Sequence, residues 1–188
     1  MRDLTEVVAA IDAENEGDPN QVAGGPRARV EGERAMHWVE VLAPDASPEL
    51  RLAARAHHLR RWSIPRSSYP DGRRGYLRWR RDLKDVHAEA VAEVLGAHGF
   101  DDASIARVQD LVRKKGLGSD PETQVLEDAI CLAFLEVQYD DLAARLDDDH
   151  MVEVLRKTLK KMSPAGRDAV AGVTLSPQGQ ALLDRALS

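Results

Sequence analysis

Apolar residues recur along most of the chain at the three- and four-residue spacing of an amphipathic helix. The first such segment carries its apolar side chains at Leu4, Val7, Val8 and Ile11. Residues at these offsets share one face of an α-helix, whereas a half-buried strand alternates at every second residue. No segment alternates convincingly with period two, so the pattern predicts an all-α protein.

Ser-Pro and Asp-Pro pairs mark where several of these helices begin. Such a pair supplies a capping side chain and then a proline at the first helical position, where the missing N–H is not needed. The pairs are Ser47-Pro48, Asp120-Pro121, Ser163-Pro164 and Ser176-Pro177. With the apolar stripes they predict helices over about 3–15, 29–42, 47–62, 75–98, 101–116, 121–139 and 148–162, and short helices after Pro164 and Pro177.

Composition limits the size and the surroundings of the protein. The 188 residues are 43% hydrophobic, enough for one core, and we expect a single-domain helical bundle over residues 1–188. A lone cysteine, Cys131, cannot form an internal disulfide, and acids interrupt the apolar stretch that a secretory signal would need. No apolar run of about eighteen residues occurs, so we expect a cytoplasmic protein that does not enter a membrane.

Positive charge is concentrated in residues 51–84. This segment holds eleven Lys/Arg and two acids, although the formal net charge of the chain is −6. So dense a cationic segment needs an anionic partner, either acids of the protein itself or an anionic ligand. The acidic chain as a whole argues against broad binding to duplex nucleic acid. The segment therefore indicates one compact anion site, with part of its charge paired internally.

Asp128 is the sharpest polar anomaly, because it lies in an apolar stripe with Val125, Ala129 and Leu132. A buried carboxylate is costly unless a cation, a metal or hydrogen-bond donors meet it. A structural salt bridge and a metal-binding or catalytic role therefore both stay open. The neighbouring Glu127 points about 100° away on a helix, and it would either flank the same site or be solvated.

Histidines supply the other candidate metal ligands. His87 lies on a core-facing stripe, as a satisfied core residue or as an inward ligand. His57 and His58 fall near the end of the third predicted helix, where consecutive residues face different ways, so we do not expect both to bind one metal. His58 is the better placed of the two, and His37 is a weaker, more exposed candidate. His58, His87 and Asp128 come from three helices that a bundle can bring together.

Cations near these histidines would hold an anion. Guanidinium groups bind phosphate bidentately, and lysine adds a point charge. The candidate phosphate-binding residues are Arg61, Arg66, Arg80, Lys84 and Lys114, with Trp62 beside them. The catalytic candidates are Glu127, Asp128 and Lys115, which would act on bound phosphate or offset its developing charge. For each single residue, a solvated or internally paired role is the ordinary alternative.

Several strings of the chain closely resemble an uncharacterised bacterial and fungal family, the domain of unknown function 4202. They include RAHHLRRWSIPRSSYP, GYLRWRRDLKDVHAE and RVQDLVRKKGLGSDPETQVLEDAICLAFLE. The resemblance covers nearly the entire chain and implies no established activity. More remotely, the order of elements resembles the HD-domain metal-dependent phosphohydrolases, an all-α superfamily in which a His, a His-Asp pair and a later Asp bind one or two metals.

The remote resemblance implies a ligand set. His37 stands where the first His falls, and His57-His58 replace the His-Asp pair. His87 begins the segment after the pair, and Asp128 takes the position of the final Asp. The Asp of the pair is missing, and Lys114-Lys115 stand where another His is often found. The resemblance therefore implies a metal site that is altered, mononuclear or absent.

Together these features predict a metal-dependent phosphohydrolase that acts on a nucleotide or small phosphoester. A divalent metal (Zn, Mn or Fe) would lower the pKa of a bound water and polarise the phosphoryl group. Two alternatives stay open. One is a non-enzymatic nucleotide- or RNA-binding protein, because basic and aromatic residues interleave. The other is an iron-dependent oxygenase on the same scaffold. The sequence does not decide the oligomeric state.

Overall fold

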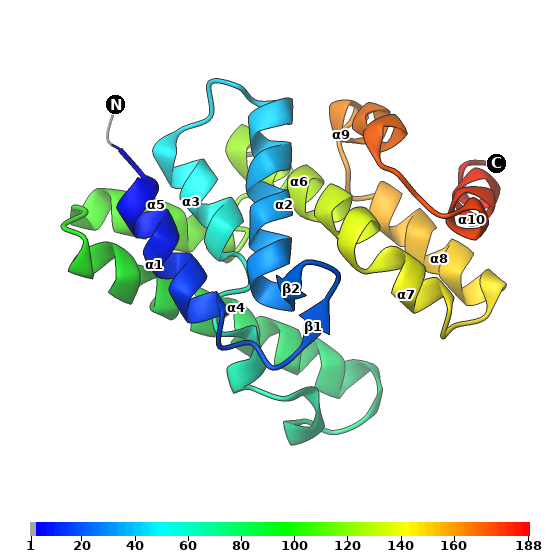
Figure 1. Cartoon of the computed structure of the whole chain (residues 1–188), viewed down its shortest axis with the longest axis horizontal. Helices are drawn as coiled ribbons and strands as arrows, with labels where there is room; N and C mark the ends of the chain where they lie inside the picture. Colours follow the sequence, from blue (N-terminus) through cyan, green and yellow to red (C-terminus); the bar gives the residue numbers. More distant parts are fainter. Residues whose placement is uncertain (1–2) are drawn as a thin grey trace.

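The computed structural model describes residues 3–188 and is built mostly from helices (Figure 1). The α-helices in this part of the chain are α1 (Thr5–Asn15), α2 (Arg27–Leu42), α3 (Pro48–Ala56), α4 (Gly72–Ala97), α5 (Asp102–Val112), α6 (Pro121–Val137), α7 (Tyr139–Ala143), α8 (Asp148–Leu159), α9 (Pro164–Ala169) and α10 (Pro177–Leu187). The same described residues include the 3₁₀ turns η1 (Arg61–Ser63), η2 (Arg66–Ser68) and η3 (Val170–Gly172). The prediction of a mostly helical single domain is confirmed.

All four predicted Ser-Pro and Asp-Pro pairs begin helices. The capping residues are Ser47, Asp120, Ser163 and Ser176, and each side chain accepts a hydrogen bond from a backbone N–H of the first turn. These bonds satisfy donors that the start of a helix otherwise leaves unpaired. The local sequence therefore determines where α3, α6, α9 and α10 begin.

Helices α2 and α6 cross and pack against each other in the middle of the molecule (Figure 1). On one side of this pair lie α1, α3, α4 and α5, and on the other side lie α7 to α10. Fully buried aliphatic side chains fill the space between the helices, among them Ala35, Leu52, Leu95 and Leu132. Burial of such apolar surface contributes roughly 25 cal/mol per Å² to stability. None of the helices within residues 3–188 has the length and apolarity of a membrane-crossing segment.

The third predicted helix ends six residues earlier than expected. Helix α3 stops at Ala56, and His57 is its C-cap. Arg60 adopts a left-handed conformation with φ 55°, which interrupts the helical path, and η1 follows. His57 and His58 therefore lie in a turn. The expectation that they face different ways, which assumed a continuous helix, does not hold.

Smaller differences from prediction occur elsewhere. Two-residue strands β1 (Gln21–Val22) and β2 (Gly25–Pro26) pair antiparallel, and they are too short to show an alternating pattern. Helix α4 begins at Gly72, three residues before its predicted start at about residue 75. Helix α7 occupies a stretch without a recognisable apolar stripe. None of these differences moves the elements that surround the candidate site.

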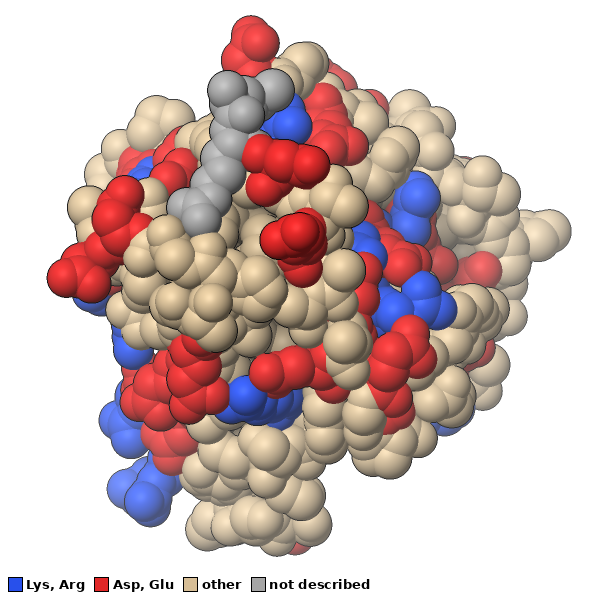
Figure 2. All heavy atoms as spheres, turned by 60° about the vertical axis from the view of Figure 1, so that its left-hand side comes forward, with Lys and Arg blue, Asp and Glu red and all other residues tan. Residues whose placement is uncertain are grey.

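Much of the cationic segment is paired with the protein's own acids. Arg55 donates to both oxygens of Asp12 at 2.6 and 2.5 Å, and Arg60 donates to both oxygens of Glu14 at 2.6 and 2.9 Å. These bidentate bonds fasten the segment to α1. On the face seen in Figure 2, Lys and Arg side chains lie interspersed among Asp and Glu. Internal pairing, predicted for part of the segment, is confirmed for these arginines.

Candidate functional site: a histidine and glutamate cluster in a cationic cavity

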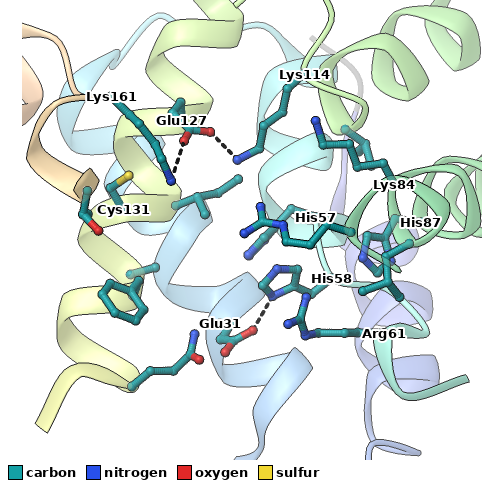
Figure 3. Close-up of a pocket in the computed structure, with 18 of the residues that line it drawn as sticks. Glu31, His57, His58, Arg61, Lys84, His87, Lys114, Glu127, Cys131 and Lys161 are labelled. Carbon is teal, nitrogen blue, oxygen red and sulfur yellow. Dashed lines mark hydrogen bonds and ion pairs between the residues drawn. The ribbon is translucent and has the colours of Figure 1, made fainter. Parts of the chain in front are cut away.

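A cavity of about 420 Å³ lies between α2, α4, α6 and α8, beside the turn after α3 (Figure 3). Six cations and two carboxylates line it: Arg61, Arg80, Lys84, Lys114, Lys157, Lys161, Glu31 and Glu127. His57, His58 and His87 complete its polar lining. The excess of positive charge suits an anionic ligand.

Glu31, His57 and His58 form a tight cluster in the wall of this cavity. Each residue offers one ligand atom, and these atoms all lie within 4.8 Å of one another. The cluster depends on a close crossing of α2 and α3 at Gly32, where an added Cβ would lie 2.3 Å from the carbonyl oxygen of Arg55. Glycine therefore brings the neighbouring Glu31 against the turn that carries both histidines.

Backbone carbonyls orient two of the imidazoles. Nδ1 of His57 lies 2.8 Å from the carbonyl oxygen of Ala54, and Nδ1 of His87 lies 2.7 Å from that of Leu59. A carbonyl oxygen only accepts, so Nδ1 carries the proton in both neutral rings and Nε2 is a free acceptor. Nδ1 of His58 contacts a carboxylate oxygen of Glu31 (Figure 3). Metal-binding histidines are commonly held through their second nitrogen in this way.

Burial keeps the imidazoles neutral. It lowers the pKa of His57 and of His58 well below the ordinary value, and the nearby Arg61 guanidinium lowers that of His58 further. Burial likewise lowers the pKa of His87 to about 4. The ring centroids of His57 and His58 are 4.1 Å apart, and those of His58 and His87 are 5.7 Å apart. Three neutral imidazoles side by side are in the protonation state that binds a metal.

Glu31 is the least satisfied group of the cluster. The residue is 1% exposed, and burial raises its pKa. Its Oε1 has no hydrogen-bond partner within residues 3–188. Nε of Arg27 lies 3.6 Å from this oxygen, which is beyond hydrogen-bond range. A buried carboxylate oxygen without a partner is costly, so a bound cation would be stabilised there.

Three of the cations have no carboxylate partner in the described part of the chain: Arg61, Arg80 and Lys84. The guanidinium of Arg61 lies over the ring of Trp79, 5.0 Å from its centroid. Arg80 donates to the hydroxyl of Tyr76 at 3.2 Å, and Lys84 donates to a backbone carbonyl at 3.2 Å. Burial lowers the pKa of Arg61 and of Lys84. An anion in the cavity would therefore relieve their mutual repulsion.

Glu127 binds lysines on the opposite wall. Its carboxylate accepts a hydrogen bond from Lys114, and Nζ of Lys161 lies 4.0 Å away (Figure 3). Burial opposes the charge on Glu127, but Lys114, followed by Lys161, outweighs it and lowers the pKa of the carboxyl. Lys114 has φ 59°, a left-handed conformation that is strained for a residue with a side chain. Such strain is often kept where a side chain must reach a site.

Most of the predicted site residues meet at this cavity. Those that line it are His57, His58, His87, Arg61, Arg80, Lys84, Lys114 and Glu127. Four others lie outside the lining. Arg66 donates to two carbonyls of its own loop at 2.9 and 3.0 Å, Lys115 pairs with an acid of α5 at 2.6 Å, His37 is exposed, and Trp62 packs at Gly17.

Asp128 is also absent from the cavity lining, so the structure does not bring it together with His58 and His87 there. Its Oδ1 accepts from the backbone N–H of Ser163 and from Gln124, both at 2.9 Å. Its Oδ2 accepts from the Ser163 hydroxyl at 2.5 Å. Gly166 lies so close that an added Cβ would be 2.6 Å from the carboxyl carbon. Asp128 therefore fastens α6 to the start of α9, and both of its oxygens are occupied.

Glu31 and Lys161 are the functional candidates that the sequence reasoning missed. Glu31 shares a buried stripe of α2 with Ala28, Ala35 and Trp38. The rule that singled out Asp128, a carboxylate within an apolar stripe, therefore applies to Glu31 as well. Lys161 carries no comparable signal, because it reaches the cavity only through the packing of the segment after α8.

The fold and the site together define a single-domain helical protein with a buried histidine and glutamate cluster in a cation-lined cavity. Residues 5–183 match the model of the family described as domain of unknown function (DUF4202), and the chain belongs to this family. No curated protein and no solved structure matches the chain.

Proposed function

We propose that this protein is a metal-dependent phosphohydrolase that acts on a nucleotide or small phosphoester. The observation that carries the proposal is the cluster of Glu31, His57 and His58, whose ligand atoms lie within 4.8 Å of one another beside unpaired cations. Such a cluster gives a metal its ligands, and the cations give a phosphate its partners. The two features adjoin in one cavity.

The donor set fits a divalent metal. Two imidazoles and one carboxylate suit Zn, Mn or Fe and leave coordination positions open. The unpartnered Oε1 of Glu31 and the neutral state of His57 and His58 support this assignment. His87, with its free Nε2, adjoins His58 as a further donor. A metal held there would supply a bound water of lowered pKa and a positive charge against the phosphoryl oxygens.

Arg61, Arg80 and Lys84 would bind the phosphate in this proposal. Guanidinium forks match two phosphoryl oxygens, and the ammonium of Lys84 adds a point charge. None of the three has to break an ion pair within residues 3–188 before it binds. Positive groups that are already in place stabilise charge that develops on the oxygens during hydrolysis.

Glu127 and Lys114 act as a pair in the proposal. The lowered pKa of Glu127 makes it a weak general base, so we assign it to holding the Lys114 ammonium toward the cavity. The pair stands on α6 and at the end of α5, across from the histidines. The proposal includes a likeness of the site to HD-domain phosphohydrolases. In it, Glu31 takes the place of the first His ligand, and His57-His58 take the place of the His-Asp pair.

Metal analysis tests the ligand set most directly. Protein purified without a histidine tag should hold close to one equivalent of metal per chain by elemental analysis. Glu31→Gln and His57→Asn should reduce that content to background. His37→Asn is the matched control, because His37 is exposed and outside the cavity, and it should retain full metal. Equal metal content in all four proteins would place the metal elsewhere and contradict the ligand set.

Activity is tested separately with a panel of phosphomonoesters and nucleotides. The metal-loaded protein should release phosphate from at least one of them, and chelation should abolish release. Arg80→Met should raise KM more than it lowers kcat, since the side chain binds phosphate in the ground state as well. Phosphate release that survives complete chelation would overturn the metal-dependent mechanism, and no release from any ester would overturn the hydrolase.

A second candidate is an iron-dependent oxygenase. Two histidines and one carboxylate are also the ligand set of non-haem Fe(II) oxygenases, and Glu31, His57 and His58 provide that set. The cationic lining would then bind an anionic substrate. Oxygen consumption by the Fe(II)-loaded protein, without phosphate release, would favour this candidate over the hydrolase.

A third candidate is a nucleotide- or RNA-binding protein without catalysis. The unpaired cations Arg61, Arg80 and Lys84 favour binding of an anion whether or not a metal is present. Binding that is unchanged in Glu31→Gln, without turnover of the bound ligand, would favour this reading.

A further inference from the structure

The cavity has an apolar wall that the metal and phosphate chemistry does not use. Ile130, Phe134, Leu142 and Val154, from α6, α7 and α8, line it. Lys157 also lies there, but its side chain is 68% exposed and pairs with Glu153. The volume of about 420 Å³ falls within the range of roughly 300–1,000 Å³ for pockets that hold small organic molecules. A bare phosphate would leave this wall uncovered, so the wall favours a ligand with an apolar portion.

Phe134 is held as a platform within this wall. Its ring packs edge-to-face against Tyr139, with centroids 6.5 Å apart and an interplanar angle of 66°. Tyr139 is fully buried, and its hydroxyl donates to the carbonyl of Gly179 at 3.2 Å. The partner ring therefore has little freedom to move and fixes the orientation of Phe134. A fixed aromatic ring binds a flat aromatic group by stacking.

Gln138, at the C-cap of α6, also lines the cavity. Its backbone N–H bonds to Phe134, but its side-chain amide forms no hydrogen bond within the described residues. An amide offers both donors and an acceptor. This combination matches the edge of a nucleobase, which presents donors and acceptors in its own plane.

We propose that the ligand of this cavity is a nucleoside monophosphate. Its phosphate lies at Arg61, Arg80 and Lys84, and its base lies against Phe134 with its edge at Gln138. This inference rests on the proposed function and narrows it, because a sugar phosphate would leave the Phe134 platform uncovered. A phosphoester with an aliphatic chain would cover the apolar wall but would offer no hydrogen-bonding edge to the Gln138 amide.

Calorimetric titration of the metal-loaded protein tests the assignment. The ligands are inorganic phosphate, ribose 5-phosphate and the nucleoside 5′-monophosphates. At least one monophosphate should bind about 10-fold or more tightly than ribose 5-phosphate, since stacking on an aromatic ring contributes that much. Phe134→Leu keeps an apolar side chain but removes the ring, so most of this advantage should disappear while phosphate binding stays unchanged.

Val41→Ala is the matched control, because Val41 is 50% exposed and outside the cavity lining. It should keep the full preference for the nucleotide. Thermal unfolding of Phe134→Leu checks that the variant is folded. If Phe134→Leu does not fold, Gln138→Ala carries the test, and a changed order of preference among the bases is expected.

The outcomes separate this inference from the hydrolase. Equal affinity for ribose 5-phosphate and every nucleotide overturns the inference, even if phosphate release is observed. A preference for a nucleotide without any phosphate release supports the binding assignment and overturns the hydrolase. A 5′-phosphorylated trinucleotide that binds as tightly as the best monophosphate would overturn the monophosphate assignment, because the ligand would then be the end of a nucleic-acid strand. A long-chain alkyl phosphate that binds more tightly than every nucleotide would also overturn the assignment.

Discussion

Glu31 and Asp128 are two carboxylates with almost the same burial, 1% and 2% exposed, and with different surroundings. Three hydrogen bonds, from Gln124 and Ser163, reach the two oxygens of Asp128. Glu31 has one oxygen against His58 and another without a hydrogen bond within residues 3–188. Burial alone therefore does not distinguish a structural carboxylate from a candidate metal ligand. Unsatisfied hydrogen-bonding capacity does.

The same contrast extends to the regions around the two residues. At the α6–α9 junction the serine that caps α9 also bonds to Asp128, so the polar groups satisfy one another. Around Glu31 the imidazoles are neutral and the neighbouring cations Arg61 and Arg80 lack carboxylate partners in the described chain. Natural proteins keep such locally unfavourable arrangements mainly at functional sites.

Acidification should produce the largest change in the free energy of unfolding, and it should act through the buried histidines near Glu31. The pKa of His87 is about 4 in the folded protein and near 6.5 when unfolded. Its contribution is therefore complete above pH 6.5 and is lost as the pH falls toward 4. A difference of this size corresponds to about 3 kcal/mol in the free energy of unfolding. Urea unfolding of the metal-free protein at several pH values measures it.

His87→Asn is the control for this titration, because an amide N–H can still donate to the Leu59 carbonyl. The variant should lose the His87 part of the slope between pH 6.5 and 4, while the part due to His57 and His58, whose pKa values burial also lowers, should remain. Asp120 does not interfere, since its hydrogen bonds with Arg107 lower its pKa to about 2 and its contribution is lost only below about pH 3.8. A wild-type protein whose stability is constant from pH 6.5 to 4 would contradict the neutral state of the buried histidines.

Replacement of Asp128 should be the most destabilising test on the structural side. Asp128→Ala removes three acceptor contacts and leaves the Ser163 hydroxyl and N–H without their partner, at a cost of about 3 kcal/mol. The metal content of the folded fraction should be unchanged. Loss of metal together with wild-type stability in urea would restore Asp128 as a ligand and remove the distinction from Glu31.

Helix starts and apolar faces could be predicted from the sequence because they depend on neighbouring residues. Ser47 and Ser163 cap helices with a proline that follows directly, and His87 faces inward from its stripe as expected. The end of α3 could not be predicted, because no glycine or proline marks it. A left-handed Arg60 ends the helical path there, and arginine has no intrinsic preference for that conformation.

The candidate site was predictable in its cations and histidines but not in its geometry. His57 and His58 meet because the chain turns between α3 and η1. Glu31 meets them because Gly32 allows α2 and α3 to cross closely. Both features depend on contacts between segments far apart in the sequence. The position of Asp128 in an apolar stripe correctly predicted a buried carboxylate. Only its tertiary contacts show that it has a structural role.

Glu31→Gln should change the stability of the metal-free protein by less than about 1 kcal/mol, in clear contrast with Asp128→Ala. The amide keeps the shape and removes a buried charge whose second oxygen has no hydrogen bond. Added metal should raise the Tm of the wild type, because a ligand that binds only the folded state stabilises it. The variant should show little of this shift. If metal-free Glu31→Gln lost as much stability as Asp128→Ala, Glu31 would have a structural role as well.

Lys114 offers the smallest and most specific test. Its left-handed backbone is unfavourable for lysine, and asparagine tolerates that conformation better than alanine does. Lys114→Asn and Lys114→Ala both remove the contact with Glu127, so the difference between them isolates the backbone. We expect the asparagine variant to be more stable by about 1 kcal/mol, while both variants lose the same affinity for inorganic phosphate.

Equal stability of the two variants would mean that the backbone at Lys114 is not strained. Wild-type phosphate affinity in both variants would mean that Lys114 does not bind the anion. The expected result would instead show that the fold accepts backbone strain at Lys114, beside the cavity, whereas both oxygens of Asp128 accept hydrogen bonds.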